Sequence, residues 1–173
     1  MLLKLIGGCI VIGSGYLFGL SFSETYLKRI KELKLLRKNL LIITNHISYA
    51  RMSLGEAMEE VALKSKEPFI TFFESISKDI NAYDSGTIVE IFANNAKKYL
   101  KGSNLTTTDI EKLIGFAEIL GYLDADLQVK NAKLYLSELE ADINELEADA
   151  NGKCKVYKCL CTAVGIFITI III

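Results

Sequence analysis

The sequence predicts an all-α protein, a cytoplasmic antiparallel bundle of about six helices flanked by two transmembrane helices. Apolar residues recur every three or four positions through residues 24–152, which is the period of a helix face. Helix-start patterns recur in the same region, with one proline in 173 residues and no hairpin signal. The mean hydropathy is +0.31, high for a water-soluble domain of this length, and the apolar excess lies at the two ends.

The first apolar segment runs from Leu5 to Ser23 without a charged residue. As a helix it rises about 28 Å, close to the ~30 Å hydrocarbon core of a bilayer. A cleaved signal peptide is the alternative, because Lys4 provides a minimal positive start. The apolar run is longer than a usual signal-peptide core and no A-x-A-like site follows it. We therefore expect a transmembrane helix over residues 1–23.

The second apolar segment, Cys159 to Ile173, is also free of charge, and Lys158 is able to extend it by snorkelling. We expect a second transmembrane helix over residues 153–173. Basic residues lie on the inner side of both spans: Lys28, Arg29, Lys31, Lys34, Arg37, Lys38, Lys153, Lys155 and Lys158. The positive-inside rule then places the domain of residues 24–152 in the cytoplasm and both termini across the membrane.

Helix starts and stops divide the region between the predicted spans. The apolar spacing from Leu27 to Ile47 predicts one long helix over residues 24–50. Ser53 to Glu56 forms a capping box that opens a short helix. Pro68 suits the first turn of the next helix. Its inner stripe, which we interpret as core and not as a ligand pocket, consists of Phe69, Phe72, Phe73, Ile76, Ile80 and Tyr83.

Two more capping boxes predict the following helix starts. They run from Thr87 to Glu90 and from Thr108 to Glu111. Gly102 and Gly121 are expected to end the helices that these boxes open. No strong helix breaker follows Asp124 until Asn151 and Gly152, which predicts a long last helix in the bundle.

The last helix of the bundle has an alternating three- and four-residue apolar repeat, typical of an antiparallel helix pair. Pairing with the helix of residues 24–50 places residue 38 beside 138 and residue 24 beside 152. The basic run of 28–38 then faces the acidic run of 138–149, although two unrelated solvated faces remain the alternative. Exposed ion pairs contribute about 0–1 kcal/mol each, so such charges specify the pairing more than they stabilise it.

The residue inventory supports neither catalysis nor a metal or cofactor site. His46 is the one histidine, and no cysteine or paired carboxylate stands at ligand spacing from it. Cys154, Cys159 and Cys161 lack the C-x-x-C spacing of zinc and redox sites. No phosphate-binding G-x-x-x-x-G-K-[ST] motif occurs, and a net charge of −1 argues against nucleic acid as a partner. We therefore expect no enzyme, no cofactor and no small-molecule substrate.

Gly15 and Gly19 form a G-x-x-x-G motif inside the first apolar segment. Such a pair permits the backbone of another transmembrane helix to approach closely. Chance occurrence in an apolar segment is the alternative. These two glycines are the candidate packing residues of the membrane part.

The order of these features resembles the stage III sporulation protein AB family of endospore-forming bacteria. MLLKLIGG is similar to the start of the family's first membrane helix, and KRIKELKLLRKNLLIITNHISYARMSLGEAMEEVA is similar to its long amphipathic helix, turn and short acidic helix. The motif positions Gly121, Asp124 and Gln128 resemble a family motif of glycine, helix start, acid and glutamine. The positions Asn151, Gly152 and Lys153 resemble the turn before its final membrane helix. Leu123, Leu127 and the segment of residues 154–156 depart from the family pattern.

The resemblance implies a membrane component of the channel complex that links mother cell and forespore during endospore formation. It implies a location in the mother-cell membrane that surrounds the forespore. The implied partners are an ATPase and other membrane proteins of that complex. The soluble domain would resemble that of the type II secretion F protein. The alternative is an inner-membrane platform subunit of a type II secretion or pilus system. Such subunits usually have duplicated helical domains and three spans, whereas this chain shows no internal repeat.

Overall fold

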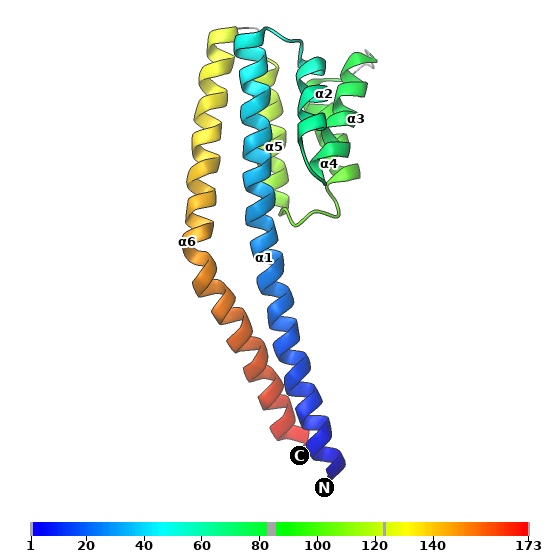
Figure 1. Ribbon diagram of the computed structural model, residues 1–173, viewed down its shortest axis with the longest axis vertical. Coiled ribbons are helices and arrows are strands. Elements are labelled where there is room, and N and C mark those ends of the chain that lie inside the picture. The colour runs from blue at the N-terminus through cyan, green and yellow to red at the C-terminus, as the bar shows by residue number, and fades with distance from the viewer. Residues whose placement is uncertain (1, 83–85, 123, 173) are drawn as a thin grey trace. The chain divides into compact units, whose positions relative to one another are not determined.

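The computed structural model describes the backbone of residues 2–82, 86–122 and 124–172, and the side chains of all of these except residues 2–6, 9, 125, 171 and 172. These residues form helices without a strand, which confirms the all-α prediction for the described chain. The helices are α1 (Leu2–Ala50), α2 (Leu54–Lys64), α3 (Phe69–Asn81), α4 (Ile88–Tyr99), α5 (Thr107–Leu120) and α6 (Ala125–Ile172) (Figure 1).

The chain divides into two compact units. The central unit is Lys31–Ile143, and the terminal unit joins Met1–Ile30 to Asn144–Ile173. Both α1 and α6 therefore contribute one part to each unit. The predicted segment boundaries at residues 23 and 152 fall inside these two helices.

Local capping fixes the starts of the short helices. The Ser53 hydroxyl accepts from the Glu56 backbone N–H at 3.3 Å, and the Glu56 carboxylate accepts from the Ser53 N–H at 2.9 Å. These Ser53 hydrogen bonds hold the pKa of Glu56 below its ordinary value. Thr87 and Glu90 form the same reciprocal pair at the start of α4. Both capping boxes are as the sequence predicts.

The predicted capping box from Thr108 to Glu111 is wrong, because the N-cap of α5 lies two residues earlier. Thr106 is the N-cap, and its backbone N–H and hydroxyl both donate to the Asp109 carboxylate at 2.8 Å. Asp109 is buried, and a buried carboxylate requires hydrogen-bond donors. The start at Thr106 supplies these donors.

An aromatic cluster forms the core of the central unit. Phe69, Phe72 and Phe73 of α3 have no exposed surface, and neither has Phe92 of α4. The Phe72 ring meets the Phe73 ring at a centroid distance of 5.0 Å and the Phe92 ring at 5.9 Å, both edge to face. The predicted inner stripe is therefore confirmed as core for these residues. Ile76 is also buried, Ile80 is half-buried, and Tyr83 lies outside the described residues.

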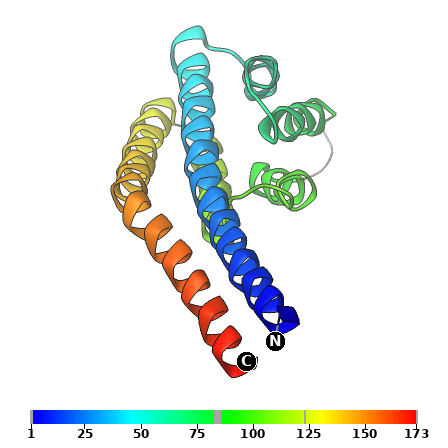
Figure 2. The ribbon, with the colours of Figure 1, turned by 60° about the horizontal axis from the view of Figure 1, so that its bottom comes forward.

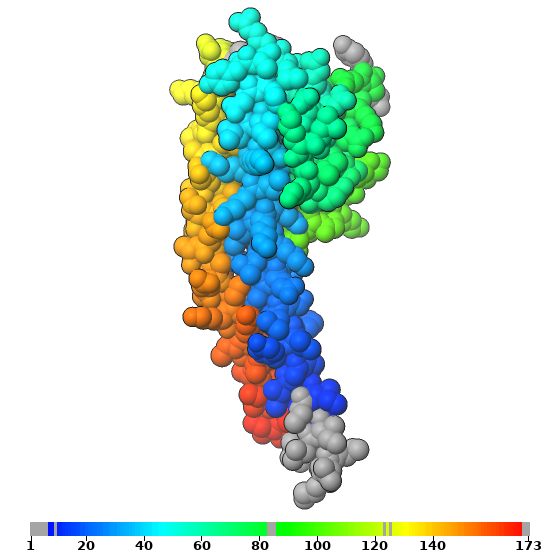
Figure 3. Space-filling view, in the orientation of Figure 1, coloured from blue at the N-terminus to red at the C-terminus, as the bar shows by residue number. Residues whose placement is uncertain are grey.

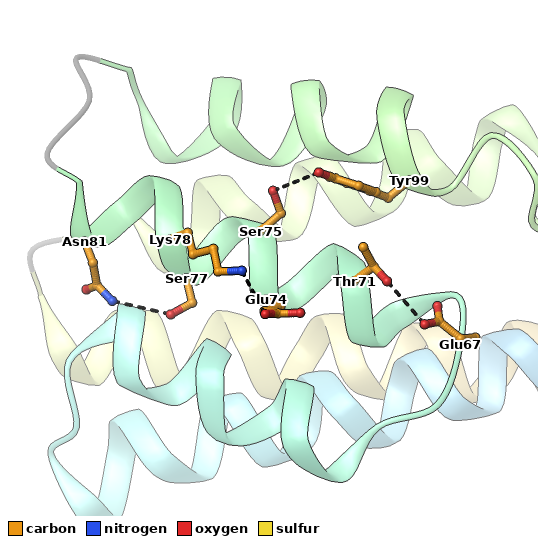
Figure 4. A network of polar contacts seen from close by, with 8 residues as sticks. All are labelled: Glu67, Thr71, Glu74, Ser75, Ser77, Lys78, Asn81 and Tyr99. Carbon is orange, nitrogen blue, oxygen red and sulfur yellow. Dashed lines mark hydrogen bonds and ion pairs between the residues drawn. The ribbon is translucent and has the colours of Figure 1, made fainter.

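The helices α2, α3 and α4 pack side by side in antiparallel order, as an end-on view of the central unit shows (Figure 2). Their side chains form a continuous surface in the space-filling view (Figure 3). Polar contacts line the contact of α3 with α4. Asn95 donates to the Asp79 carboxylate at 2.6 Å. Ser75 donates to the Tyr99 hydroxyl at 3.5 Å (Figure 4). These bonds fix the register of the two helices.

The contacts between α1 and α6 follow the predicted antiparallel pairing in each unit. In the central unit, the Arg37 guanidinium donates to the Leu136 carbonyl at 3.3 Å and to the Glu140 carboxylate at 2.6 Å. In the terminal unit, the Tyr26 hydroxyl donates to the Leu146 carbonyl at 3.2 Å. The acidic run is shared among several partners, because Asp142 pairs with Lys112 of α5 and not with α1.

The expected turn at Asn151 and Gly152 is absent, because α6 continues through both residues without interruption. An isolated glycine costs a helix about 1 kcal/mol relative to alanine. Packing of Ala150, which is buried, and an ion pair from Lys153 to Asp149 at 3.1 Å support the helix on either side of that glycine.

Within the described residues, no helix is long and apolar enough to cross a membrane. Residues 1–6, 9 and 171–173 of the two predicted spans lie outside the residues whose side chains are described. The two transmembrane helices stay a prediction.

Candidate functional site

The family-motif residues near position 124 build the corner between α5 and α6. Gly121 is the C-cap of α5. The Asp124 carboxylate accepts from the backbone N–H groups of Asp126 at 2.9 Å and Leu127 at 3.1 Å, so Asp124 caps the start of α6. The Gln128 side-chain amide donates to the Leu120 carbonyl at 2.8 Å, which satisfies an unpaired carbonyl at the end of α5. These three motif positions therefore act together on the direction in which α6 leaves α5.

The second group of motif positions lies inside α6 in the terminal unit. Asn151 and Gly152 are exposed. The Lys153 ammonium lies 3.1 Å from the Asp149 carboxylate and 5.5 Å from the centroid of the Tyr26 ring. Lys153 thus links α6 to α1, whereas a Cβ atom at Gly152 would meet no atom within 4 Å.

Glycines bring the backbones of α1 and α6 together in the terminal unit. A Cβ atom at Gly15 would lie 2.8 Å from the carbonyl oxygen of Cys161, and one at Gly19 would lie 2.9 Å from the Cα of Lys158. Both distances are too short for real Cβ atoms. The G-x-x-x-G residues therefore pack against α6 of the same chain.

A third glycine completes this contact from the other helix, and sequence reasoning missed it. A Cβ atom at Gly165 would lie 3.2 Å from the Val11 carbonyl oxygen and 3.3 Å from the Cα of Ile12. Gly165 is the one glycine in the apolar run of residues 159–173, and that was the available signal. We call Gly15, Gly19 and Gly165 the glycine contact.

Small residues line the inside of the terminal helix pair and large apolar residues cover its outside. Gly8, Gly19, Ser23 and Gly165 are buried. Large apolar side chains are exposed instead, and among them Leu17 is 66% exposed, Phe167 65% and Ile170 69%. A water-soluble helix pair has the opposite distribution, with its large apolar residues facing inward.

Two ionisable residues of the central unit, Tyr135 and His46, are half-buried. Burial against Phe116 raises the pKa of the Tyr135 phenol far above its ordinary value, and the nearby carboxylates of Asp109 and Asp142 raise it further. Tyr135 therefore stays protonated. His46 is half-buried near Glu60 of α2. No cluster of metal-ligating side chains occurs among the residues that the structure describes.

Three cysteines are described, and all are free thiols. Cys154, Cys159 and Cys161 lie along α6 in the terminal unit. The Cys154 thiol lies 3.9 Å from the Ser23 carbonyl oxygen, and the Ser23 hydroxyl donates to the Cys154 carbonyl at 3.3 Å. Cys9 lies outside the described side chains.

Comparison with known proteins agrees with this arrangement of motifs. The family model of stage III sporulation protein AB matches residues 4–173. The chain belongs to this family. A role in sporulation follows from this membership, and the resemblance stated from the sequence is confirmed.

Two relatives show how much of the chain the likeness covers. The chain is 25% identical to stage III sporulation protein AB of Bacillus subtilis (strain 168) over 171 residues, which is 99% of each chain. It is also similar to a solved structure of stage III sporulation protein AB (SpoIIIAB), with a TM-score of 0.65 and 27% identity. That match covers 71% of this chain and 96% of the solved chain.

Proposed function

We propose that this protein is a membrane scaffold of the channel complex between mother cell and forespore, required for endospore formation. Its two ends cross the mother-cell membrane, and its central unit stands in the cytoplasm, where it docks a partner ATPase. The observation that carries the proposal is the surface of the terminal helix pair, with large apolar residues outside and the glycine contact inside.

Lipid accounts for this surface better than water does. In a bilayer, large apolar side chains that face outward carry no free-energy penalty, because lipid tails are as apolar as they are. Close backbone packing at small residues then drives helix association. In water, an apolar surface of this kind would favour aggregation or a covering partner. The basic residues beside both predicted spans then favour a cytoplasmic central unit.

A scaffold agrees with the roles that the motif residues have. Gly121, Asp124 and Gln128 cap and join helices. The side chains of Asp124 and Gln128 form these hydrogen bonds with backbone groups of the same chain. We propose that the protein is not itself an enzyme and that the energy for the complex comes from the ATPase. The family membership favours the sporulation complex over a secretion or pilus platform.

The membrane arrangement is tested with a single cysteine at position 102, in a chain whose native cysteines are replaced. Gly102 is exposed, and a Cβ atom there meets no atom within 4 Å. We expect the protein to stay in the membrane after alkaline carbonate extraction. A membrane-impermeant maleimide should label position 102 in permeabilised cells alone, whereas a cysteine at position 4 should be labelled in intact cells. Release by carbonate, or labelling of position 102 in intact cells, would contradict the arrangement.

The scaffold role is tested in a sporulating strain. Deletion of the protein should block sporulation after engulfment begins and leave growth unchanged. Single charge reversals such as Glu59→Lys and Glu118→Lys lie at exposed positions, so each should change stability by under about 0.5 kcal/mol. At least one such reversal in a scan of the exposed faces should lose both the co-purifying ATPase and heat-resistant spores.

His46→Gln is the matched control, because it removes the one imidazole without altering a proposed docking face. We expect normal spore counts from this variant. Retention of the ATPase by a chain that lacks residues 31–143 would show that the central unit is not the docking surface. A loss of spores in His46→Gln with normal protein levels would argue for chemistry and against a scaffold.

A further inference from the structure

The hydrogen bonds between α1 and α6 fix the register of the terminal helix pair. The Ser23 hydroxyl donates to the Cys154 carbonyl at 3.3 Å, and the Thr169 hydroxyl donates to the Gly8 carbonyl at 3.5 Å. Fifteen positions separate the two contact residues on α1, and fifteen separate the two on α6. One antiparallel register therefore holds along this whole length. We call residues that stand side by side in it one level of the pair.

This register places Lys158 at a level inside the first predicted span. A Cβ atom at Gly19 would lie 2.9 Å from the Cα of Lys158, so these two residues share a level. Gly19 comes four residues before Ser23, where the predicted span of residues 1–23 ends. The backbone of Lys158 therefore stands about 6 Å farther into the predicted span than that of Ser23.

The charge of Lys158 limits how deep the pair sits in hydrocarbon. Lys158 is half-buried, and it forms no ion pair with any residue that the structure describes. A charged side chain in the middle of a bilayer is costly, so its ammonium group has to reach the headgroups or water. The level of Gly19 and Lys158 therefore marks one boundary of the hydrocarbon around the pair.

The side chains just beyond this level are those of a membrane interface. The Lys153 ammonium lies 5.5 Å from the centroid of the Tyr26 ring, and the Tyr157 ring lies 6.1 Å from the Phe22 ring. Lys155, between these two residues of α6, is exposed. Tyrosine is enriched at both interfaces of a bilayer, and lysine side chains near helix ends extend toward the headgroups.

On the other side of this level, hydroxyl groups are satisfied by their own helices. Ser14 donates to the Val11 carbonyl at 2.9 Å. Thr162 donates to the Lys158 carbonyl at 2.7 Å, and Thr169 donates to the Gly165 carbonyl at 2.8 Å. Polar groups in hydrocarbon need such internal partners, because no water is available to them. This part of the pair is therefore the part suited to lipid.

The levels without charge are few. The first charged residue on the far side is Lys4 of α1, which leaves the fourteen residues 5–18 between it and Gly19. The register places residues 159–172 of α6, which are also free of charge, beside them. Fourteen helical residues rise about 21 Å, whereas the hydrocarbon core of a typical bilayer is about 30 Å thick. Snorkelling of Lys4 and Lys158 makes up part of the difference, and any tilt of the pair increases it.

The glycine contact prevents the helices from sliding to a longer match. Lys158 would reach the level of Ser23 if α6 moved by four residues along α1. The backbones approach closely at Gly19 and again at Gly165, where a Cβ atom would lie 3.2 Å from the Val11 carbonyl oxygen. A slide would bring larger residues to these points of close approach. The register that the glycines permit thus sets the length of the charge-free levels.

We infer that the terminal helix pair is matched to a hydrocarbon layer thinner than that of a typical bilayer, and that it binds phospholipids with short acyl chains in preference to longer ones. Mismatch between a span and the lipid costs free energy for each ångström, so lipids of matching length bind more tightly. The inference rests on the membrane anchoring proposed above. It adds the class of lipid that the anchor prefers.

The test uses a single tryptophan as a reporter of the neighbouring lipid. The chain contains no tryptophan, and Ile10, which is 66% exposed, lies among the charge-free levels. The full chain with Ile10→Trp is reconstituted in mixtures of brominated dioleoyl phosphatidylcholine, which quenches tryptophan, with an unbrominated phosphatidylcholine of known chain length. The residual fluorescence gives the binding constant of each lipid relative to the brominated one.

We expect the largest relative binding constant for a lipid shorter than dioleoyl phosphatidylcholine, such as the dipalmitoleoyl or dimyristoleoyl lipid. The largest constant for the dioleoyl lipid, or for the longer dieicosenoyl or dierucoyl lipids, would overturn the inference.

Two lysine variants in the Ile10→Trp chain test the cause. Lys158→Leu moves the first charge of α6 to Lys155, three residues away, and lengthens the charge-free levels by about 4.5 Å. The preferred lipid should then have longer acyl chains. Lys155→Leu is the matched control, because it makes the same exchange while Lys158 still sets the boundary, and it should leave the preferred lipid unchanged. No shift in Lys158→Leu, or equal shifts in both variants, would overturn the inference.

Carbonate extraction of the same vesicles separates this inference from the proposed function. A chain that carbonate removes, or whose tryptophan the brominated lipid does not quench, is not anchored in the bilayer, and both proposals then fail. A chain that resists extraction and is quenched, but that prefers dioleoyl or longer lipids, refutes the thickness inference alone.

Discussion

Replacing Phe72 by alanine should lower the free energy of unfolding of the central unit by about 3–5 kcal/mol. The Phe72 side chain has no exposed surface, and its ring meets Phe73 and Phe92 edge to face at 5.0 Å and 5.9 Å. The substitution removes both ring contacts and leaves a cavity between α3 and α4. Native domains are stable by about 5–15 kcal/mol, so this loss is a large part of the total.

Urea denaturation of the full chain in detergent, followed by far-ultraviolet circular dichroism, measures this effect. Leu63→Ala is the matched control, since it also truncates a large apolar residue of the central unit. Leu63 lies on α2 and is 77% exposed, so its truncation should change the free energy of unfolding by less than about 0.5 kcal/mol. Similar midpoints for Phe72→Ala and the wild type would show that the aromatic cluster is not the core.

The features that the sequence predicts well are those with local causes. Ser53 with Glu56 and Thr87 with Glu90 are reciprocal hydrogen-bond pairs three residues apart, so no tertiary information is needed to find them. The stripe of Phe69, Phe72 and Phe73 follows from the helical period alone. The pairing of α1 with α6 was predictable because both chain ends were expected to leave one membrane surface.

The sequence does not predict features for which two local patterns are equally good, or features that depend on residues far away in the chain. Thr106 and Thr108 each precede an acidic residue by three positions, and burial of Asp109 decides between them. Glycine disfavours a helix, yet α6 continues through Gly152 because residues on both sides of it are packed. Glu32 stands in a basic run as an exception until Asn104, 72 residues away, is seen to bind it.

The candidate site shows the same division. Resemblance to the family motif indicates Gly121, Asp124 and Gln128, but their joint role at the α5–α6 corner depends on contacts between two helices that no local pattern predicts. Gly15 and Gly19 were found by their spacing, which does not say which helix approaches them. Gly165 has no second glycine four residues away, so the G-x-x-x-G pattern does not reveal this part of the contact.

Replacing Gly19 by leucine should separate α1 from α6 in the terminal unit. A Cβ atom at this position would lie 2.9 Å from the Lys158 Cα and 3.0 Å from the Tyr157 carbonyl oxygen. Both neighbours are backbone atoms, which are unable to move aside without displacing the helix. Overpacking of this kind costs about 1–3 kcal/mol, occasionally more, which lowers the equilibrium constant for pairing roughly fivefold to hundredfold.

A disulfide between α1 and α6 reports the pairing. Ser23→Cys is combined with native Cys154, whose thiol lies 3.9 Å from the Ser23 carbonyl oxygen, and the other cysteines are replaced. Mild oxidation should crosslink the two positions within one chain when Gly19 is present. In Gly19→Leu the initial rate of crosslinking should fall by up to about fivefold to hundredfold, in keeping with the cost above.

Gly13→Leu is the control that separates overpacking from a general effect of leucine on this helix. Gly13 lies on α1, six residues before Gly19, and a Cβ atom there meets no atom within 4 Å. The two variants have the same composition, so hydrophobicity and helix propensity are matched. Normal crosslinking in Gly13→Leu with a loss in Gly19→Leu assigns the effect to the glycine contact. Equal crosslinking in both variants would mean that α6 does not approach Gly19 in the membrane, and the pairing of the two spans would then rest on other residues.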